Sequence, residues 1–148
     1  MFYYTPDFEA TTPDIPGFID QVLAETNQGY VASGVNTSLR AAHPDVAVFY
    51  NYAEVSGDAF SQGLSHIRGQ GEASGTFINN LRAQYNADFV ALIIDDPQYC
   101  GIAYLGPRKD LMYSVTSWSC ATGYYSFGHE IGHNMGLNHD RGTSSACS

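Results

Sequence analysis

Positively charged residues are scarce in this sequence. Six Lys and Arg residues stand against 15 Asp and Glu residues, which gives a formal net charge of −9 at pH 7. Nucleic acids and anionic membrane surfaces attract basic proteins, so this deficit argues against both as partners. No apolar run approaches the roughly 20 residues that a membrane-spanning helix requires. We therefore expect neither a nucleic-acid partner nor a membrane partner.

The start of the sequence lacks the pattern of a secretory leader. Residues 1–6 read MFYYTP, with no basic stretch followed by an apolar one. We expect the chain to be the mature part of a longer precursor or a partial product of its gene. Its 148 residues, 44% of them hydrophobic, with 15 Gly and 11 Tyr, are typical of one globular domain with a buried core.

The order of apolar patterns predicts a mixed α/β fold. Residues 89–94 (FVALII) form a continuous apolar run that is typical of a central strand buried on both faces. Alternation predicts a half-buried strand over 35–42, and apolar spacing predicts a helix over 14–34. The predicted order β-α-β-α-β-β-β-α implies a mixed, mostly parallel sheet with helices packed on it. The remaining predicted strands are 2–5, 46–52 (or an extended loop), 101–105 and 111–118, and further helical spacing covers 60–67 and 77–86.

The most informative stretch is residues 127–140, FGHEIGHNMGLNHD. His129 and His133 are four residues apart, so on a helix their imidazoles lie on one face, one turn apart. Gly136 is suited to end that helix and turn the chain back, which brings His139 towards the same point. Three imidazoles around one ion leave a fourth position for water, as in a catalytic zinc site. Glu130, next to the first ligand, fits the role of general base.

The spacing H-E-x-x-H-x-x-G-x-x-H resembles that of the metzincin clan of zinc endopeptidases. With Asp140 after the third His, it resembles the reprolysin (adamalysin-like) group. The phrases at 86–93, 99–105 and 120–130 fall in an order similar to that of bacterial peptidases of the peptidyl-Asp metalloendopeptidase type. The resemblance implies a secreted zinc metalloendopeptidase, with one catalytic Zn²⁺ on His129, His133 and His139 and with Glu130 as the base.

The resemblance also implies a domain organisation and a mode of substrate binding. It predicts a single, partial metzincin domain over 1–148, with an upper subdomain over 1–135 and the start of a lower one over 136–148. A polypeptide substrate would add along an antiparallel edge strand near Gly101–Leu105. Metzincins carry a Met-containing turn well after the third His, and Met135, inside the motif, cannot serve as that turn. We therefore expect a chain truncated before the Met-turn, and a monomer.

Three interpretations of the motif stay open. The first is an active endopeptidase domain, the second is a zinc-binding but inactive fragment, and the third is a binding module with a structural metal. The last is disfavoured because a structural site takes a fourth protein ligand and has no use for Glu130.

The three cysteines cannot all pair within the chain. We hypothesise a Cys100–Cys120 disulfide, because Cys100 precedes a predicted edge strand and Cys120 precedes the motif helix. Cys147 would then pair outside the chain or stay free. Three reduced cysteines are the alternative.

Other polar groups have simpler interpretations. Asp95 and Asp96 end a predicted strand and offer a possible calcium site, although such a pair more often faces solvent. His43 and His66 are expected to be structural or surface residues, and Asp140 to fix the chain around His139. Arg108, Lys109 and Arg141 would suit an aspartate-specific cleft, but solvated surface cations are the favoured interpretation.

Overall fold

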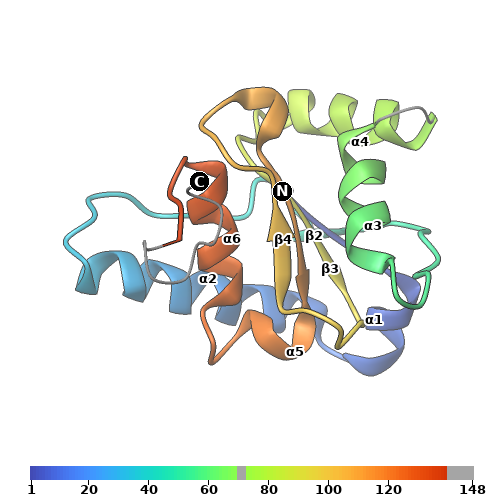
Figure 1. Ribbon diagram of the computed structural model, residues 1–148, viewed down its shortest axis with the longest axis horizontal. Helices are drawn as coiled ribbons and strands as arrows, with labels where there is room; N and C mark the ends of the chain where they lie inside the picture. The colour runs from blue at the N-terminus through green and yellow to red at the C-terminus, as the bar shows by residue number, and fades with distance from the viewer. Residues whose placement is uncertain (70–72, 140–148) are drawn as a thin grey trace, which may run out of the picture.

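A computed structural model describes residues 1–69 and 73–139 of the chain. Its centre is a five-stranded sheet in the order β2-β1-β3-β5-β4 (Figure 1). All neighbouring strands are parallel except β4, which pairs antiparallel with β5 at one edge. The predicted mixed, mostly parallel sheet with an antiparallel edge strand is therefore confirmed. The strands are β1 (Phe2–Tyr4), β2 (Ala47–Phe49), β3 (Val90–Ile94), β4 (Gly101–Ala103) and β5 (Tyr113–Ser117).

Helices cover both faces of this sheet, as Figure 1 shows. One face packs against α3 (Ala59–Arg68) and α4 (Ala73–Gln84), and the other against α1 (Pro6–Thr11), α2 (Ile15–Ala32) and α6 (Ser126–Asn134). A 3₁₀ turn (Lys109–Leu111) and α5 (Trp118–Ala121) flank β5. None of the described helices combines the length and hydrophobicity that a membrane crossing requires.

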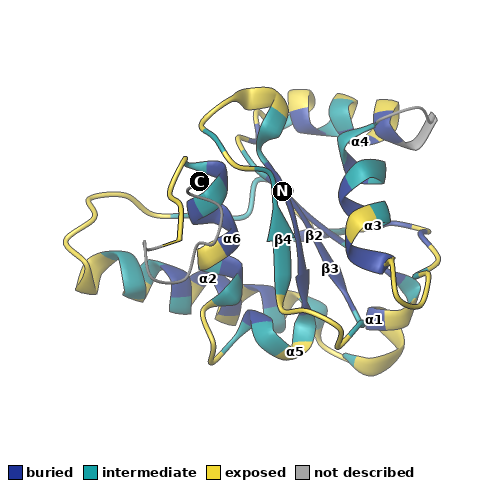
Figure 2. Ribbon diagram, in the orientation of Figure 1, coloured by how far each residue is buried: buried dark blue, intermediate teal, exposed yellow. Residues whose placement is uncertain are grey.

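The central strand β3 lies between two apolar clusters. All five of its residues are buried, as predicted from the continuous apolar run (Figure 2). Leu92 and Ile94 join the cluster under α3, while Ala91 and Ile93 join the cluster under α2 and α6. Burial of each such side chain contributes about 1.5–3 kcal/mol, so the two-sided core holds α6 firmly against the sheet.

The predicted strand over residues 35–42 is wrong. This segment has no strand pairing, and Val35 is 44% exposed. The side chain of Asn27 takes the place of a neighbouring strand: its Nδ2 donates to the Leu39 carbonyl at 2.9 Å, and its Oδ1 accepts from the Leu39 N–H at 2.6 Å. The alternation places Val35, Thr37, Leu39 and Ala41 on one side; Leu39 and Ala41 pack against the cluster under α2, whereas Val35 and Thr37 are exposed.

The helix α1 was not among the predicted helices, and its first residue, Pro6, directly follows the predicted strand over 2–5. Proline is also favoured in the first turn of a helix, where its missing N–H costs nothing. Thr5 caps this helix, since its hydroxyl accepts from the Phe8 N–H at 3.3 Å. Asp14 caps α2, where its Oδ1 accepts from the Gly17 N–H at 3.0 Å.

Candidate metal centre

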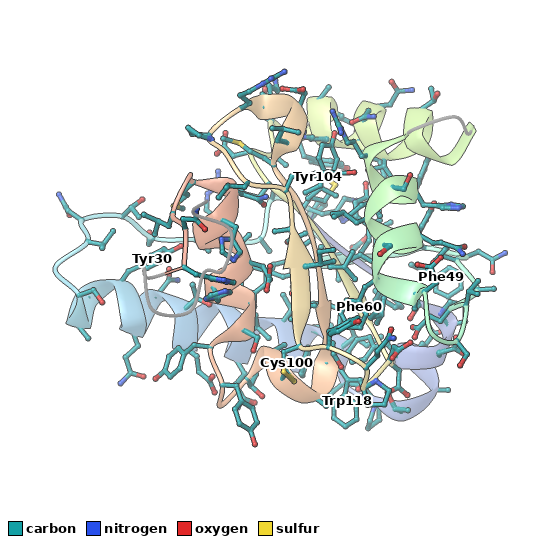
Figure 3. All side chains as sticks on the ribbon, viewed as in Figure 1. Tyr30, Phe49, Phe60, Cys100, Tyr104 and Trp118 are labelled. Carbon is teal, nitrogen blue, oxygen red and sulfur yellow. A yellow bond between two sulfur atoms is a disulfide. The ribbon has the colours of Figure 1, made fainter. Side chains whose placement is uncertain are left out.

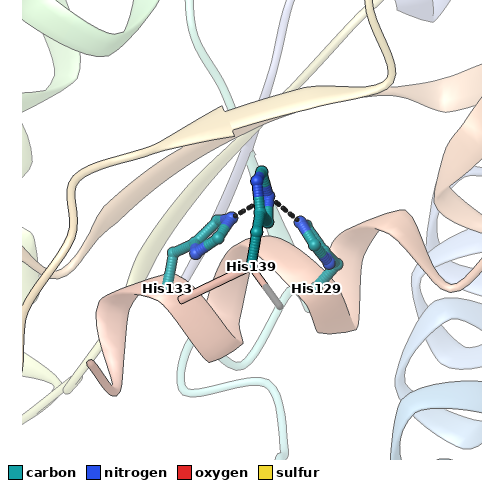
Figure 4. A group of neighbouring side chains, drawn as sticks. All are labelled: His129, His133 and His139. Carbon is teal, nitrogen blue, oxygen red and sulfur yellow. Dashed lines mark hydrogen bonds between the residues drawn. The ribbon is translucent and has the colours of Figure 1, made fainter. Parts of the chain in front are cut away.

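The helix α6 holds two of the predicted ligands on one face (Figure 4). It begins at Ser126, and Thr122 ends the separate helix α5. Tyr125 occupies the cap position in a left-handed conformation (φ 57°) with no side-chain capping bond. The start of α6 is thus set by the tight turn at 122–125, which the sequence pattern did not reveal.

Gly136 turns the chain back after α6, as predicted. Its φ of 93° lies in the region that favours glycine. The turn brings His139 over the helix, between the other two imidazoles (Figure 4). Its Nε2 lies 3.0 Å from Nε2 of His129 and 3.1 Å from Nε2 of His133. Among the described residues, these three are the group of His, Cys, Asp and Glu side chains spaced to hold a metal ion.

The spacing of these imidazoles and the tautomer of His133 fit a zinc ion. Nitrogens bound tetrahedrally at about 2.0–2.1 Å from zinc lie about 3.3–3.4 Å apart, close to the two distances given above, and the donor atoms of all three imidazoles lie within 4.8 Å of one another. Nδ1 of His133 lies 2.8 Å from the Leu137 carbonyl, to which it donates a hydrogen bond. That bond places the proton on Nδ1 and leaves the Nε2 lone pair free to bind a metal. The three nitrogens therefore form a preorganised donor set.

Glu130 lies beside this donor set but is directed at the edge strand. The side chain is buried, and this burial raises its pKa to about 7. A carboxylate with a pKa near neutrality is well matched to accept and return a proton at physiological pH. Burial also lowers the pKa of His129, and the neighbouring His133 and His139 lower it further. A depressed pKa keeps that imidazole neutral, as metal binding requires.

Gly101 on β4 makes room for the Glu130 side chain. A Cβ atom at this position would lie 2.6 Å from both Cγ and Oε1 of Glu130. The absence of a side chain therefore allows the carboxyl group to pack directly on the strand backbone. A glycine in a strand often marks such a close approach, but the sequence did not show that Glu130 would be the neighbour.

An open cleft of about 550 Å³ runs between β4 and α6. Its walls are the three strand residues 101–103 on one side and the three imidazoles with Glu130 on the other. Tyr99 and Tyr124, both exposed, also line this cleft. The predicted edge strand is confirmed in position and direction, although it ends at Ala103 and Leu105 lies outside it.

A disulfide joins Cys100 to Cys120, as hypothesised. Cys100 directly precedes β4, and Cys120 lies in α5, so the bond ties one end of the edge strand to the segment before α6 (Figure 3).

The other singled-out residues lie away from the cleft or outside the described chain. Asp95 accepts from the Trp118 indole, and Asp96 from the Gln98 N–H at 2.8 Å. The imidazole of His43 accepts from the Asp45 N–H at 3.1 Å, and His66 packs on Tyr52. Arg108 pairs with Asp110 at 2.9 Å and Lys109 is exposed. Asp140, Arg141 and Cys147 lie outside the described residues.

Comparison with known proteins agrees with this geometry. Residues 18–140 match the model of the family described as metallo-peptidase family M12B, reprolysin-like. The chain belongs to this reprolysin-like family. The resemblance inferred from the motif is therefore confirmed over most of the chain.

The relatives of this M12B chain are longer proteins. It is 38% identical over 136 residues to a peptidyl-Asp metalloendopeptidase of Stenotrophomonas maltophilia, which covers 91% of this chain and 31% of that protein. It is 33% identical to a peptidyl-Asp metalloendopeptidase of Xanthomonas campestris, over the same shares of both chains. A solved structure described as a chaperone-substrate complex has the same fold, with a TM-score of 0.71 at 21% identity, covering 97% of this chain and 24% of that one. The chain thus spans about a third of its curated relatives.

Proposed function

We propose that this chain carries the zinc centre and upper cleft of a zinc-dependent endopeptidase. The observation that supports this proposal most strongly is the convergence of three imidazole nitrogens beside the buried Glu130, under an open edge strand. In this proposal residues 1–135 form an upper subdomain, and residues 136–148 begin a lower one. The protein would act outside the cytoplasm, in keeping with the Cys100–Cys120 disulfide.

His129, His133 and His139 would hold the ion through Nε2. Zinc bound there supplies a Lewis acid and a water of pKa ~7. Glu130 would take a proton from the attacking water and return it to the leaving amine, since its carboxyl group is buried in the cleft beside the imidazoles. The Leu137 carbonyl holds His133 in its tautomer through both steps.

The edge strand β4 would hold the substrate by main-chain hydrogen bonds. The Ser117 N–H donates to the Cys100 carbonyl at 3.0 Å, and the Tyr104 N–H donates to the Tyr113 carbonyl at 3.3 Å. Main-chain groups alternate in direction along a strand, so Cys100, Ile102 and Tyr104 face β5. The N–H and C=O groups of Gly101 and Ala103 then face the open edge. A peptide added there would lie in the cleft, next to Glu130 and the imidazoles.

We further propose a preference for aspartate at the cleavage site, which is supported by the relatives that are named peptidyl-Asp metalloendopeptidases. Arg108 and Lys109 are exposed, and Arg108 already pairs with Asp110. We therefore infer that residues beyond the cleft described here contribute to this preference.

Hydrolysis of matched peptides tests the proposal. The chain is loaded with zinc and given two peptides that differ only in one residue, Asp or Asn. We expect cleavage of the Asp peptide, loss of cleavage with a chelator, and recovery when zinc is restored. Stoichiometric zinc without cleavage would instead identify the chain as an inactive zinc-binding fragment. Absence of zinc binding would refute the metal centre itself.

A further inference from the structure

The proposed zinc ligands and the proposed substrate strand belong to different parts of the chain. All three imidazoles come from residues 129–139, and the substrate groups come from β4, residues 101–103. The geometry among the imidazoles is therefore set by one short segment. Attack on a peptide bond additionally requires that this segment sit at a fixed distance from β4, because a displacement of about 1 Å can cost about 10²-fold in rate.

Asn134 bridges these two parts. It is the last residue of α6 and is fully buried. Its Nδ2 lies 2.9 Å from the Tyr104 carbonyl, 3.0 Å from the Leu111 carbonyl and 3.1 Å from the Tyr113 carbonyl. Tyr104 follows β4 directly, and Tyr113 begins β5. One side chain thus contacts both ends of the connection between the edge strand and its neighbour.

The orientation of this amide is fixed by its surroundings. Two N–H groups face three carbonyl oxygens, whereas Oδ1 is buried without a partner. A flipped amide would set its oxygen against those carbonyls, so the carbonyls define which atom is the donor. The buried Oδ1 has no hydrogen-bond partner, which costs free energy. The hydrogen bonds that Nδ2 donates to the carbonyls offset this cost.

Two further contacts also fix the end of α6 relative to the connection between β4 and β5. The Gly106 N–H donates to the His133 carbonyl at 3.0 Å, which links the connection after β4 to the helix turn that carries a ligand. A Cβ at Gly136 would lie 3.1 Å from Cδ of Pro107, so the turn after α6 also packs closely on this connection. In this contact region, the Asn134 side chain donates hydrogen bonds to several carbonyls of the connection between β4 and β5.

We propose that Asn134 is a positioning residue that sets the distance between the zinc helix and the substrate strand. The inference rests on the proposed endopeptidase function and goes beyond it. It requires that loss of the carboxamide leave zinc binding intact, because the three ligands do not depend on β4. It also requires that the substrate still bind β4 but lie badly placed for attack. The expected signature is a fall in kcat with little change in KM.

The test compares Asn134→Ala with Asn79→Ala in the full chain. Asn79 lies on α4, on the opposite face of the sheet, where its Oδ1 accepts from the Tyr113 hydroxyl at 2.5 Å. Both changes remove a carboxamide next to Tyr113, but of these two residues only Asn134 belongs to the segment that carries the imidazoles. Asn134→Ser, which keeps one donor, is a second variant with an expected intermediate effect. Each protein is assayed at a temperature at which its circular dichroism shows the folded state.

We expect Asn134→Ala to bind one zinc ion per chain, to lose kcat by roughly 10–100-fold and to keep KM within about 3-fold. Asn79→Ala should keep kcat even where it unfolds at a lower temperature. Equal loss of kcat in both variants, or loss of zinc from Asn134→Ala, would overturn the proposal.

Hydrogen exchange gives a readout that is independent of activity. The Gly106 amide should lose protection in Asn134→Ala and keep it in Asn79→Ala, because its acceptor is the His133 carbonyl. If the wild-type chain cleaves nothing, the endopeptidase proposal fails, and this exchange comparison still decides the positioning role. Equal protection of Gly106 in both variants would contradict that role.

Discussion

The sheet ends in two edge strands of the same length, and within residues 1–69 and 73–139 only the β4 edge faces a group of side chains that could hold a metal ion. β4 and β2 each contain three residues. On β2, the Tyr50 N–H donates to the Tyr4 carbonyl at 2.8 Å, so Val48 faces β1 and Ala47 and Phe49 direct their main-chain groups outward. β4 likewise has two outward-facing residues, Gly101 and Ala103. On β2, however, the Ala47 N–H already donates to the Asp45 carbonyl at 2.8 Å, so β2 offers one free main-chain donor fewer than β4.

The two edges also differ in their side chains and in their anchoring. β4 consists of Gly101, Ile102 and Ala103, and its two outward-bonding residues are small enough for Glu130 and a peptide to approach. The Cys100–Cys120 disulfide holds its start, and Asn134 contacts the residue that follows its end. β2 instead exposes Phe49 and has no such helix across its free edge among the described elements. In the proposed function β4, and not β2, holds the substrate because the segment that carries the three imidazoles is fixed beside it.

Among the variants that distinguish β4 from β2, Gly101→Ala should have the largest effect on activity. The new methyl group would meet Cγ and Oε1 of Glu130 at 2.6 Å, so the carboxyl group must move. We expect kcat/KM to fall roughly 10²-fold, since misplacing a catalytic group costs about this much. Phe49→Val on β2 is the control and should leave kcat/KM unchanged. Steady-state kinetics on one peptide measures both, and an unimpaired Gly101→Ala protein would refute the close-approach account.

Removal of the disulfide should have the next largest effect, and it acts on stability. In the double variant Cys100→Ser with Cys120→Ser, a loop with a sequence separation of 20 residues is no longer closed in the unfolded chain. We expect the free energy of unfolding to fall by about 3 kcal/mol. Urea denaturation followed by circular dichroism measures this change. An unchanged midpoint in the variant would show that the bond does not anchor β4.

Proline substitution tests which main-chain groups bind substrate. Ala103→Pro removes an N–H that faces the open edge, and Phe49→Pro removes the equivalent group on β2. We expect Ala103→Pro to raise KM about 3–10-fold, because a hydrogen bond contributes about 0.5–1.5 kcal/mol. The Phe49→Pro protein should keep the wild-type KM. Ile102→Pro, which removes a bond to β5 instead, should lower stability more than Ala103→Pro does.

The smallest predicted effect concerns Glu54, which lies at the carboxyl ends of β1 and β3. Its carboxylate accepts from the Thr5 hydroxyl and from the Asp95 N–H at 2.9 and 3.1 Å. Burial raises its pKa above the ordinary value of 4.5, although these hydrogen bonds lower it in part. The folded state therefore keeps the proton at a pH where the unfolded chain has lost it. The stabilisation from Glu54 is complete below pH 4.5 and is lost as pH rises through the folded pKa.

Glu54→Gln removes this pH dependence and keeps an amide oxygen as acceptor. The stability of the variant relative to the wild type should therefore increase as pH rises from 4.5 towards neutrality. Urea midpoints of both proteins across this range provide the measurement. A constant difference between them would contradict the raised pKa.

Local patterns predicted the parts of the structure that depend on neighbouring residues. The spacing of His129 and His133 placed them on one helix face, and Gly136 ended that helix. The apolar run at 89–94 predicted the central strand. Alternation over 35–42 described burial at Leu39 but not at the exposed Val35, and it did not predict the bonding, because the partner of Leu39 is the side chain of Asn27. Periodicity reports which side chains face the core, and not which group satisfies the backbone.

The contacts that position the centre could not be predicted in this way. Gly101 meets Glu130 and Asn134 meets Tyr104 across long stretches of sequence. Neither residue shows a local pattern that identifies its partner, since Gly101 fits any strand with a close neighbour and Asn134 fits any helix end. Only the packing of α6 against β4 and β5 brings these groups together.

The central claim is that Glu130 acts on a substrate held beside a zinc ion bound by three histidines. Glu130→Gln tests this most directly, with zinc binding and peptide hydrolysis measured on the same sample. We expect the variant to bind one zinc ion as the wild type does, because Glu130 is not a ligand, and to lose hydrolysis by roughly 10²–10⁴-fold. Hydrolysis at the wild-type rate in a zinc-loaded Glu130→Gln protein would contradict the account.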